Sequence, residues 1–212
     1  MACIYIITKK NIKIMIEFKL NEKDYKMATS WEELTLEKYA NLVNLQGQET
    51  DIKVEELYLL KIVGALCGVD LGELYELDMT TVRDLVDGLT FIYKQPEWPL
   101  KRFIMFNDKM YVFPQELNKI TMGEIISIKT LQENKTQGEF LPYLLAIILR
   151  PGEEYEVDGV KKYRQDKFNA DDIEVRRELF MNLTIPEIMG SINFFLSGNN
   201  LSPNNSPVSI EK

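Results

Sequence analysis

Histidine is the residue type whose absence most restricts the chemistry of this chain. None of the 212 residues is histidine, which removes the commonest general base and the commonest metal ligand. The two cysteines are Cys3 and Cys67. Cys67 follows an apolar run and is interpreted as a small buried hydrophobe. Nothing in the sequence favours a disulfide between them, and this cysteine usage fits a reducing compartment.

Carboxylates are plentiful, but their spacing does not make a site. The doublets are Glu32/Glu33, Glu55/Glu56, Glu153/Glu154 and Asp171/Asp172. Neighbours on a helix point about 100° apart, so such pairs do not converge and instead indicate solvated faces and helix N-termini. Glycine-rich phosphate loops and GxSxG turns are both missing from the sequence. We therefore predict no catalytic, metal or cofactor site and a non-enzymatic protein; a carboxylate-only active site is the enzymatic alternative.

The charge balance argues against nucleic acid and the apolar pattern against a membrane. The net charge is −8 and the pI about 4.8, whereas nucleic-acid binders need a basic face. The densest basic stretch is the short run 161–164. The longest apolar run, Leu141–Leu149, falls short of the roughly 20 residues that span a bilayer. The N-terminus has no secretory pattern, so we expect a cytosolic product without a nucleic-acid or membrane partner.

The stretch 18–42, FKLNEKDYKMATSWEELTLEKYANL, introduces the architecture. Apolar Ile16, Phe18 and Leu20 alternate with charged residues, which predicts a strand, and a polar turn at 21–24 leads to a second strand. A helix should follow, capped either by Ser30, with Glu33 completing a capping box, or by Thr35. Further helices are expected at 54–67, at 82–93 with Thr80/Thr81 as the cap, at 141–149 and at 184–196, and Thr121 and Thr184 carry capping-box patterns.

The same stretch recurs 86 positions later at 104–128. Asn21, Lys23, Tyr25 and Thr35 match the identical residues Asn107, Lys109, Tyr111 and Thr121. Two further blocks follow in the same order, and the last is displaced by 103 positions because the second copy is longer. We therefore predict a tandem duplication. The expected fold class is α+β and predominantly helical, with two modules that each contain a β-hairpin and about three helices.

The duplication defines the expected boundaries. Module 1 spans 15–98 and module 2 spans 99–198, and the short apolar junction predicts a shared core. Residues 1–14 are either an N-terminal extension or contain an ordinary first strand, and the Asn/Ser/Pro-rich tail 199–212 should be disordered. The extra residues of module 2 lie at 151–172, where Asp158–Gly159 predicts a hairpin turn. This insertion either carries function or is a neutral loop expansion.

Four residues are candidates for a partner interface. Trp98 lies between two prolines at the module junction, and Tyr155, Tyr163 and Arg164 lie in the insertion. Large aromatic side chains and arginine are the usual anchors of protein interfaces. Trp31, beside the helix cap, is interpreted as a packing residue.

The pattern of an apolar strand, LNxKxY and then TSWEELTLEKYANL resembles the opening of small structural or assembly proteins of tailed bacteriophages, the crAss-like group included. The resemblance covers about residues 15–45. It implies a non-enzymatic role in the virion or in host cytoplasm during assembly: a ring, head-tail connector or tail component, or a tail-assembly chaperone. Its expected partners are other virion or assembly proteins, in a ring or homo-oligomer. The alternative is a cytosolic adaptor or regulatory binding module that uses the 151–172 insertion.

Overall fold

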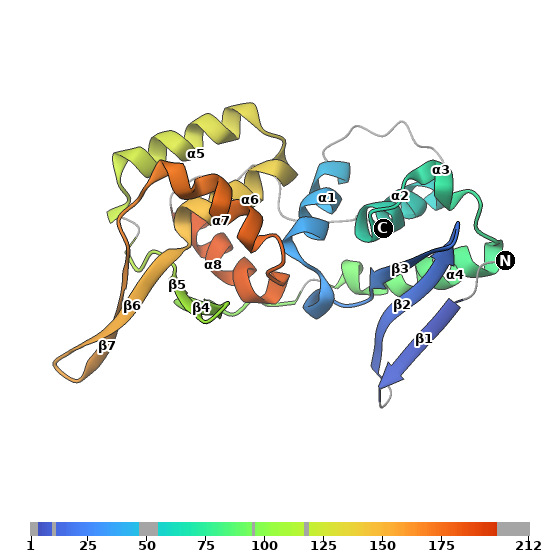
Figure 1. Cartoon of the computed structure of the whole chain (residues 1–212), viewed down its shortest axis with the longest axis horizontal. Coiled ribbons are helices and arrows are strands. Elements are labelled where there is room, and N and C mark those ends of the chain that lie inside the picture. Colours follow the sequence, from blue (N-terminus) through green and yellow to red (C-terminus); the bar gives the residue numbers. More distant parts are fainter. Residues whose placement is uncertain (1–3, 10–11, 47–54, 95, 117–118, 199–212) are drawn as a thin grey trace.

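A computed structural model describes residues 4–9, 12–46, 55–94, 96–116 and 119–198 (Figure 1). The structure is 55% helical and 21% strand, so the predicted α+β, mainly helical fold class is confirmed. Cys3 and the tail 199–212, for which disorder was predicted, lie outside the described residues.

The hairpin of module 1 belongs to a three-stranded antiparallel sheet in the order β1-β2-β3, whose strand β1 lies before the predicted module start at residue 15. Residues 4–9 are the first strand of this sheet and pair with β2. Of the two interpretations of residues 1–14, the structure therefore supports an ordinary first strand over an N-terminal extension. The helices that follow cover this sheet, and α2 and α4 contact the β2–β3 hairpin. The elements are β1 (Ile4–Lys9), β2 (Ile12–Leu20), β3 (Lys23–Ala28), η1 (Trp31–Glu33), α1 (Leu36–Gln46), α2 (Glu55–Cys67), α3 (Leu71–Leu74), α4 (Met79–Gly88) and η2 (Leu89–Tyr93).

Module 2 repeats this order and adds a hairpin. Its sheet has the order β4-β5-β6-β7, and the hairpin β6–β7 extends away from the body of the molecule (Figure 1). The predicted turn at Asp158–Gly159 is confirmed, because both residues have positive φ and Val157 pairs with Val160. The elements are β4 (Phe103–Phe106), β5 (Lys109–Val112), α5 (Met122–Asn134), α6 (Gln137–Ile148), β6 (Arg150–Val157), β7 (Val160–Gln165), η4 (Ala170–Asp172), α7 (Ile173–Phe180) and α8 (Ile185–Gly198).

The two hairpins have the same geometry, as the duplication predicts. The turn residues Asn21 and Glu22 have φ values of 47° and 65°, and Asn107 and Asp108 have 49° and 58°. The strand registers also match, since Phe18 pairs with Tyr25 and the corresponding pair 86 positions later is Ile104 with Tyr111. Two-residue turns with both φ values positive suit the twist of a hairpin. The repeated Asn, Lys and Tyr therefore belong to the scaffold.

These turns lead to a stability prediction. Glutamate rarely adopts positive φ, whereas glycine does so without steric cost. Glu22→Gly should raise the free energy of unfolding by up to about 1 kcal/mol, and Asp108→Gly should gain less because aspartate tolerates this region better. Glu22→Ala is the matched control and should give no gain. Urea denaturation would measure all three, and equal stability of the Glu22→Gly and Glu22→Ala variants would contradict the prediction.

Two of the predicted helix starts are confirmed. Thr121 precedes α5, its hydroxyl accepts a hydrogen bond from the Glu124 N–H, and the Glu124 carboxylate accepts one from the Thr121 N–H at 2.8 Å. At the start of α8, the Thr184 N–H donates to the Glu187 carboxylate, also at 2.8 Å. Each threonine thus fixes the direction in which its helix leaves the preceding loop.

At α1 the structure supports the second of the two predicted caps, and at α4 the cap differs from the prediction. Ser30 makes no side-chain capping bond, and α1 instead begins after Thr35, the alternative cap, whose hydroxyl accepts from the Lys38 N–H at 3.5 Å. Thr80 and Thr81 do not cap α4: their N–H groups donate to the Asp78 carboxylate at 3.0 and 2.9 Å. A carboxylate one turn earlier can satisfy both donors and also interacts favourably with the helix dipole, so it takes the capping position.

The Asp78 cap predicts a pH dependence. Hydrogen bonds from Thr81 hold the pKa of Asp78 below its ordinary value of 3.8. Its ionised form therefore stabilises the fold above that value, and this contribution is lost as the pH falls through the lowered pKa. The melting temperature of the wild type should exceed that of Asp78→Ala at neutral pH, and the gap should shrink towards about pH 3. Asp78→Asn retains an uncharged cap, so the difference between its melting temperature and that of Asp78→Ala should not change with pH. A pH-independent difference between the wild type and Asp78→Ala would contradict the assignment.

The modules share one hydrophobic core, as the short junction predicts. A single cluster of buried side chains contains residues of both modules. In Figure 1, α1 lies between the two lobes, and it packs on α6 of module 2 as well as on α2. The Leu36 N–H donates to the Leu183 carbonyl at 2.8 Å, beside a bridge between Thr35 and Thr184. The start of α1 is therefore held by the loop that precedes α8.

The two residues interpreted as packing residues lie against the core of module 1, where Trp31 is buried and Cys67 is partly buried. Trp31 is 5% exposed, and its indole N–H donates to the carbonyls of Phe91 and Lys94, so its interpretation as a packing residue is confirmed. Cys67 is a free thiol, and burial raises its pKa to about 12. The thiol is therefore protonated at neutral pH and is a poor nucleophile.

Candidate functional site: a basic groove in module 2

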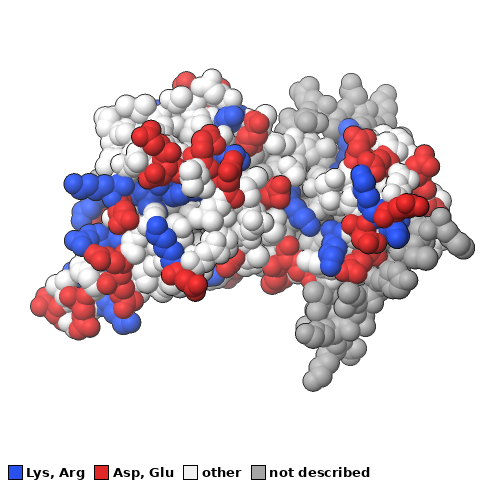
Figure 2. Space-filling view, viewed as in Figure 1, with Lys and Arg blue, Asp and Glu red and all other residues white. Residues whose placement is uncertain are grey.

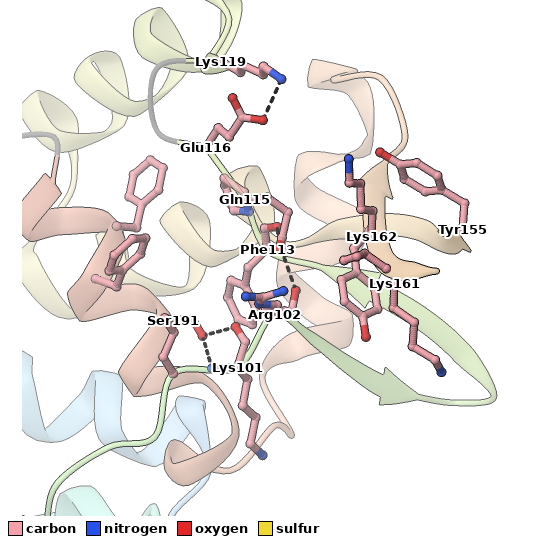
Figure 3. Close-up of a pocket in the computed structure, with 16 residues that line it drawn as sticks. Lys101, Arg102, Phe113, Gln115, Glu116, Lys119, Tyr155, Lys161, Lys162 and Ser191 are labelled. Atoms are coloured by element: carbon pink, nitrogen blue, oxygen red, sulfur yellow. Dashed lines mark hydrogen bonds and ion pairs between the residues drawn. The ribbon is translucent and has the colours of Figure 1, made fainter. Parts of the chain in front are cut away.

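A concave site of module 2, which we call the basic groove, lies between the segment before β4, the segment after β5, the β6–β7 hairpin and α8 (Figure 3). Its volume is about 610 Å³. The groove is lined by Leu100, Lys101, Arg102, Phe113, Pro114, Gln115, Glu116, Lys119, Tyr155, Val160, Lys161, Lys162, Tyr163, Ser191, Phe194 and Phe195.

Positive charge dominates this lining. It contains one carboxylate, Glu116, against the cations Lys101, Arg102, Lys119, Lys161 and Lys162. Lys119 pairs with Glu116 at 2.7 Å and Lys161 with Glu154 at 2.8 Å, and these hydrogen bonds raise the pKa of both lysines. Among the described residues, the other three cations have no carboxylate within ion-pair distance. In Figure 2, Lys and Arg gather at the end of the molecule that carries module 2, above the projecting hairpin.

Aromatic side chains supply much of the remaining lining of the groove. Phe113 is buried, whereas Phe194 and Tyr155 are 47% and 40% exposed. Tyr163 stacks on Phe103 of β4 with ring centroids 4.9 Å apart, which holds β7 against the start of the β4–β5 hairpin. Cations beside half-exposed aromatic rings suit a ligand that carries both carboxylates and apolar side chains.

A buried polar cluster fixes the base of the hairpin. Arg150, the first residue of β6, donates to the Glu124 carboxylate and to the Gln165 amide oxygen, both at 2.8 Å. Gln165, the last residue of β7, donates to the carbonyl of Ile148 at 2.6 Å and to that of Val112. The cluster thus joins both ends of the β6–β7 hairpin to α5, α6 and β5. The hairpin leaves the body in a defined direction because these bonds have few alternative arrangements.

Arg150 and Glu124 are among the few buried charged residues of the described chain. Burial lowers the pKa of Arg150, and the contact with Glu124 opposes that shift. The guanidinium also lies over the ring of Phe168, 5.9 Å from its centroid. Glu124 is at the same time the capping-box residue of α5. One carboxylate therefore positions both the helix start and the hairpin.

The opposite wall of the groove is held by α8. The Ser191 hydroxyl accepts from the Lys101 N–H at 3.1 Å and donates to the Lys101 carbonyl at 2.7 Å. At Gly190 a Cβ atom would lie 2.3 Å from the Pro99 carbonyl oxygen. The glycine therefore lets the junction segment approach α8 closely. Lys101 and Arg102 are presented to the groove from a segment that is fixed on this side.

Three of the four predicted interface residues lie on the hairpin. Tyr155 and Tyr163 line the groove. Arg164 forms an ion pair with Glu153, and its guanidinium lies 5.8 Å from the centroid of the Tyr155 ring. Trp98 does not line the groove: it lies at the junction, edge-on to Trp31, with ring centroids 5.4 Å apart. The structure thus brings together the hairpin residues and separates Trp98 from them.

Sequence reasoning missed the cations that come from outside the insertion. Lys101, Arg102 and Lys119 correspond to Met15, Ile16 and Glu33 of module 1, 86 positions earlier. A comparison of charge between the two copies would have identified all three as changes specific to module 2. They converge with Lys161 and Lys162 because of the direction in which the hairpin leaves the body. The spacing of residues in the sequence does not indicate that direction.

Other kinds of site find no support in the part of the chain that the structure describes. No group of three or more His, Cys, Asp or Glu side chains could hold a metal there, and no described helix is long and apolar enough to cross a membrane. No protein-family model, curated protein sequence or solved structure matches this chain.

Proposed function

We propose that this chain is a non-enzymatic structural or assembly protein of a tailed-bacteriophage virion, a head-tail connector, ring or tail component or a tail-assembly chaperone, and that it binds its partners through module 2. The similarity of its opening stretch to such proteins supports the virion role. The basic groove is the observation that supports the mode of action. It combines cations that have no carboxylate partner among the described residues with half-exposed aromatic side chains, in a chain of net charge −8.

The comparison of the two modules favours the groove as the working surface. Module 1 has the same hairpin geometry and the same order of helices, but its residues at the positions of Lys101 and Arg102 are apolar. It also lacks a counterpart of β6–β7 among its described elements. A partner surface is therefore best placed where the second copy has acquired charge and a rigidly held hairpin.

Mass spectrometry of purified virions and of assembly intermediates tests the proposed role. A structural component is expected in the virion at a fixed copy number. A chaperone is expected in the intermediates and absent from the finished particle. Absence from both would contradict the proposal.

An adaptor or regulatory binding module is the second candidate, favoured by the way β6–β7 extends from the body of module 2 (Figure 1). On this account the hairpin alone recognises the partner. Replacing residues 153–164 with a short turn should then abolish partner capture and leave the melting temperature of the body nearly unchanged. If capture survives that deletion, the adaptor hypothesis fails, whereas groove cations outside the hairpin could still support assembly contacts.

A further inference from the structure

Strand β4 is an uncovered edge in a position that is covered in module 1. There, the outer edge of β2 pairs with β1 through an antiparallel ladder that includes Phe18 with Ile4 and Ile16 with Ile6. The equivalent edge in module 2 belongs to β4, which stands first in the order β4-β5-β6-β7. Among the described residues, no strand pairs with it. The duplication therefore shows how this edge can be completed.

The composition of β4 is unusual for a free edge. All four of its residues, Phe103–Phe106, are apolar, and Met105 is 56% exposed. The corresponding positions of β2 include the charged residues Glu17 and Lys19. Soluble proteins usually protect exposed edges with charge, proline or bulges, because an apolar edge invites pairing with another chain. None of these protections occurs within β4.

The register shows which backbone groups of β4 are free to pair. The Phe113 N–H donates to the Arg102 carbonyl at 2.9 Å, so Arg102 and Phe113 form a hydrogen-bonded pair. Such pairs alternate along an antiparallel ladder. Ile104 therefore bonds to β5, whereas the N–H and carbonyl groups of Phe103 and Met105 point to the outer edge. The Ser191 hydroxyl already satisfies both groups of Lys101, so the open edge begins at Phe103.

We propose that the outer edge of β4 receives an extended segment of a partner protein as an added antiparallel strand. This deepens the proposed function, on which it rests, by stating how the partner is held. In module 1, the C-terminal half of β1 lies against the part of β2 that corresponds to the segment before β4. A partner strand in the same orientation would leave β4 beside Lys101 and Arg102. It should therefore consist of a short apolar strand followed by acidic residues.

The chemistry of this edge favours a polypeptide over a nucleic acid. Backbone N–H and carbonyl groups in a row recognise another backbone, and main-chain bonds supply much of the affinity in strand addition. Lys101, Arg102 and Lys162, which have no carboxylate partner in the part of the chain that the structure describes, are too few for the phosphate neutralisation on which nucleic-acid affinity depends. They suffice to orient a short acidic segment.

A matched pair of variants tests the strand addition. Met105→Pro removes an outward N–H that β5 does not use, and the backbone of an edge strand tolerates proline there. Met105→Val retains the N–H. The probe is a labelled synthetic peptide of alternating valine and threonine followed by aspartate and glutamate, with the full-length chain. The Met105→Pro variant should bind it about tenfold more weakly or worse, and the Met105→Val variant like the wild type. Equal melting temperatures of the two variants show that the hairpin is intact.

Amide hydrogen exchange gives an independent readout. On peptide binding, the Phe103 and Met105 amides should become protected, whereas the Ile104 amide, which is bonded to β5, should change little. Lys101→Glu combined with Arg102→Glu should weaken binding, and Lys19→Glu in module 1 is the charge control. Equal binding by the Met105→Pro and Met105→Val variants would overturn the strand addition. If the groove cations still mattered in that case, the proposed partner surface would survive without it.

Discussion

Replacing Arg150 with alanine should lower the free energy of unfolding by about 3–5 kcal/mol, one of the largest losses expected for a single side chain outside the apolar core. Arg150 is 8% and Glu124 2% exposed, and they are 2.8 Å apart. Without the guanidinium, the Glu124 carboxylate would remain buried without its cation, and Gln165 would lose its donor. The hairpin base would then lose its connection to α5. Urea denaturation followed by tryptophan fluorescence would measure the loss.

Two comparisons separate this effect from a general loss of charge. Arg150→Met combined with Glu124→Gln removes both charges while filling the space, and should be markedly more stable than Arg150→Ala alone. Lys161→Gln removes a cation from the exposed pair with Glu154 on the same hairpin and should leave the denaturation midpoint unchanged. If Arg150→Ala behaved like Lys161→Gln, the buried cluster would not be what holds the hairpin.

Gly138→Ala should destabilise the contact between the modules by about 1–3 kcal/mol or more. At this position α6 of module 2 approaches α1 of module 1. An added Cβ atom would lie 2.0 Å from the Ala40 carbonyl oxygen and 2.5 Å from the Asn44 side-chain oxygen. The first neighbour is backbone, so one helix must shift away from the other. The Gly138 N–H would also lose its bond of 2.9 Å to Asn44.

Gly123→Ala is the matched control for this prediction. Its Cβ atom would contact the Phe168 ring at 3.3 Å, which a side chain can accommodate, and alanine favours the helix. Gly123→Ala should therefore be neutral or slightly stabilising. Equal stability of the Gly138→Ala and Gly123→Ala variants in the same denaturation experiment would show that α1 and α6 are not in close contact.

The duplicated parts of the fold could be predicted because they depend on local chemistry. The turn at Asn107–Asp108 and the cap at Thr121 repeat features of module 1 that a comparison within one chain reveals. The hairpin at 151–172 could be predicted because Asp158–Gly159 specifies its turn. The start of α6 was missed although Thr136 and Glu139 form a capping box. The prediction placed the start of this helix too late, at Leu141, because the apolar run begins there.

The remainder depends on contacts between residues far apart in sequence. Arg150 and Glu124 are separated by 26 positions, and no periodicity in the sequence indicates that they meet. Lys101 precedes β4 and Lys162 lies in β7, yet both line the same groove. The open edge of β4 could not be recognised until the pairing of β1 with β2 was known. Each of these features arises from tertiary packing, which propensity and spacing do not encode.

Photo-crosslinking from the groove, in cells that are assembling particles, tests the central claim most directly. A photoreactive residue at Lys162 samples the groove, and one at the exposed Lys19, which lies in the β2–β3 hairpin of module 1, is the control. We predict that Lys162 forms a crosslink to a virion structural or assembly protein through a short apolar and acidic segment, and that Lys19 does not. Crosslinking from Lys19 alone, or equal crosslinking from both positions, would contradict the claim that module 2 carries the partner surface.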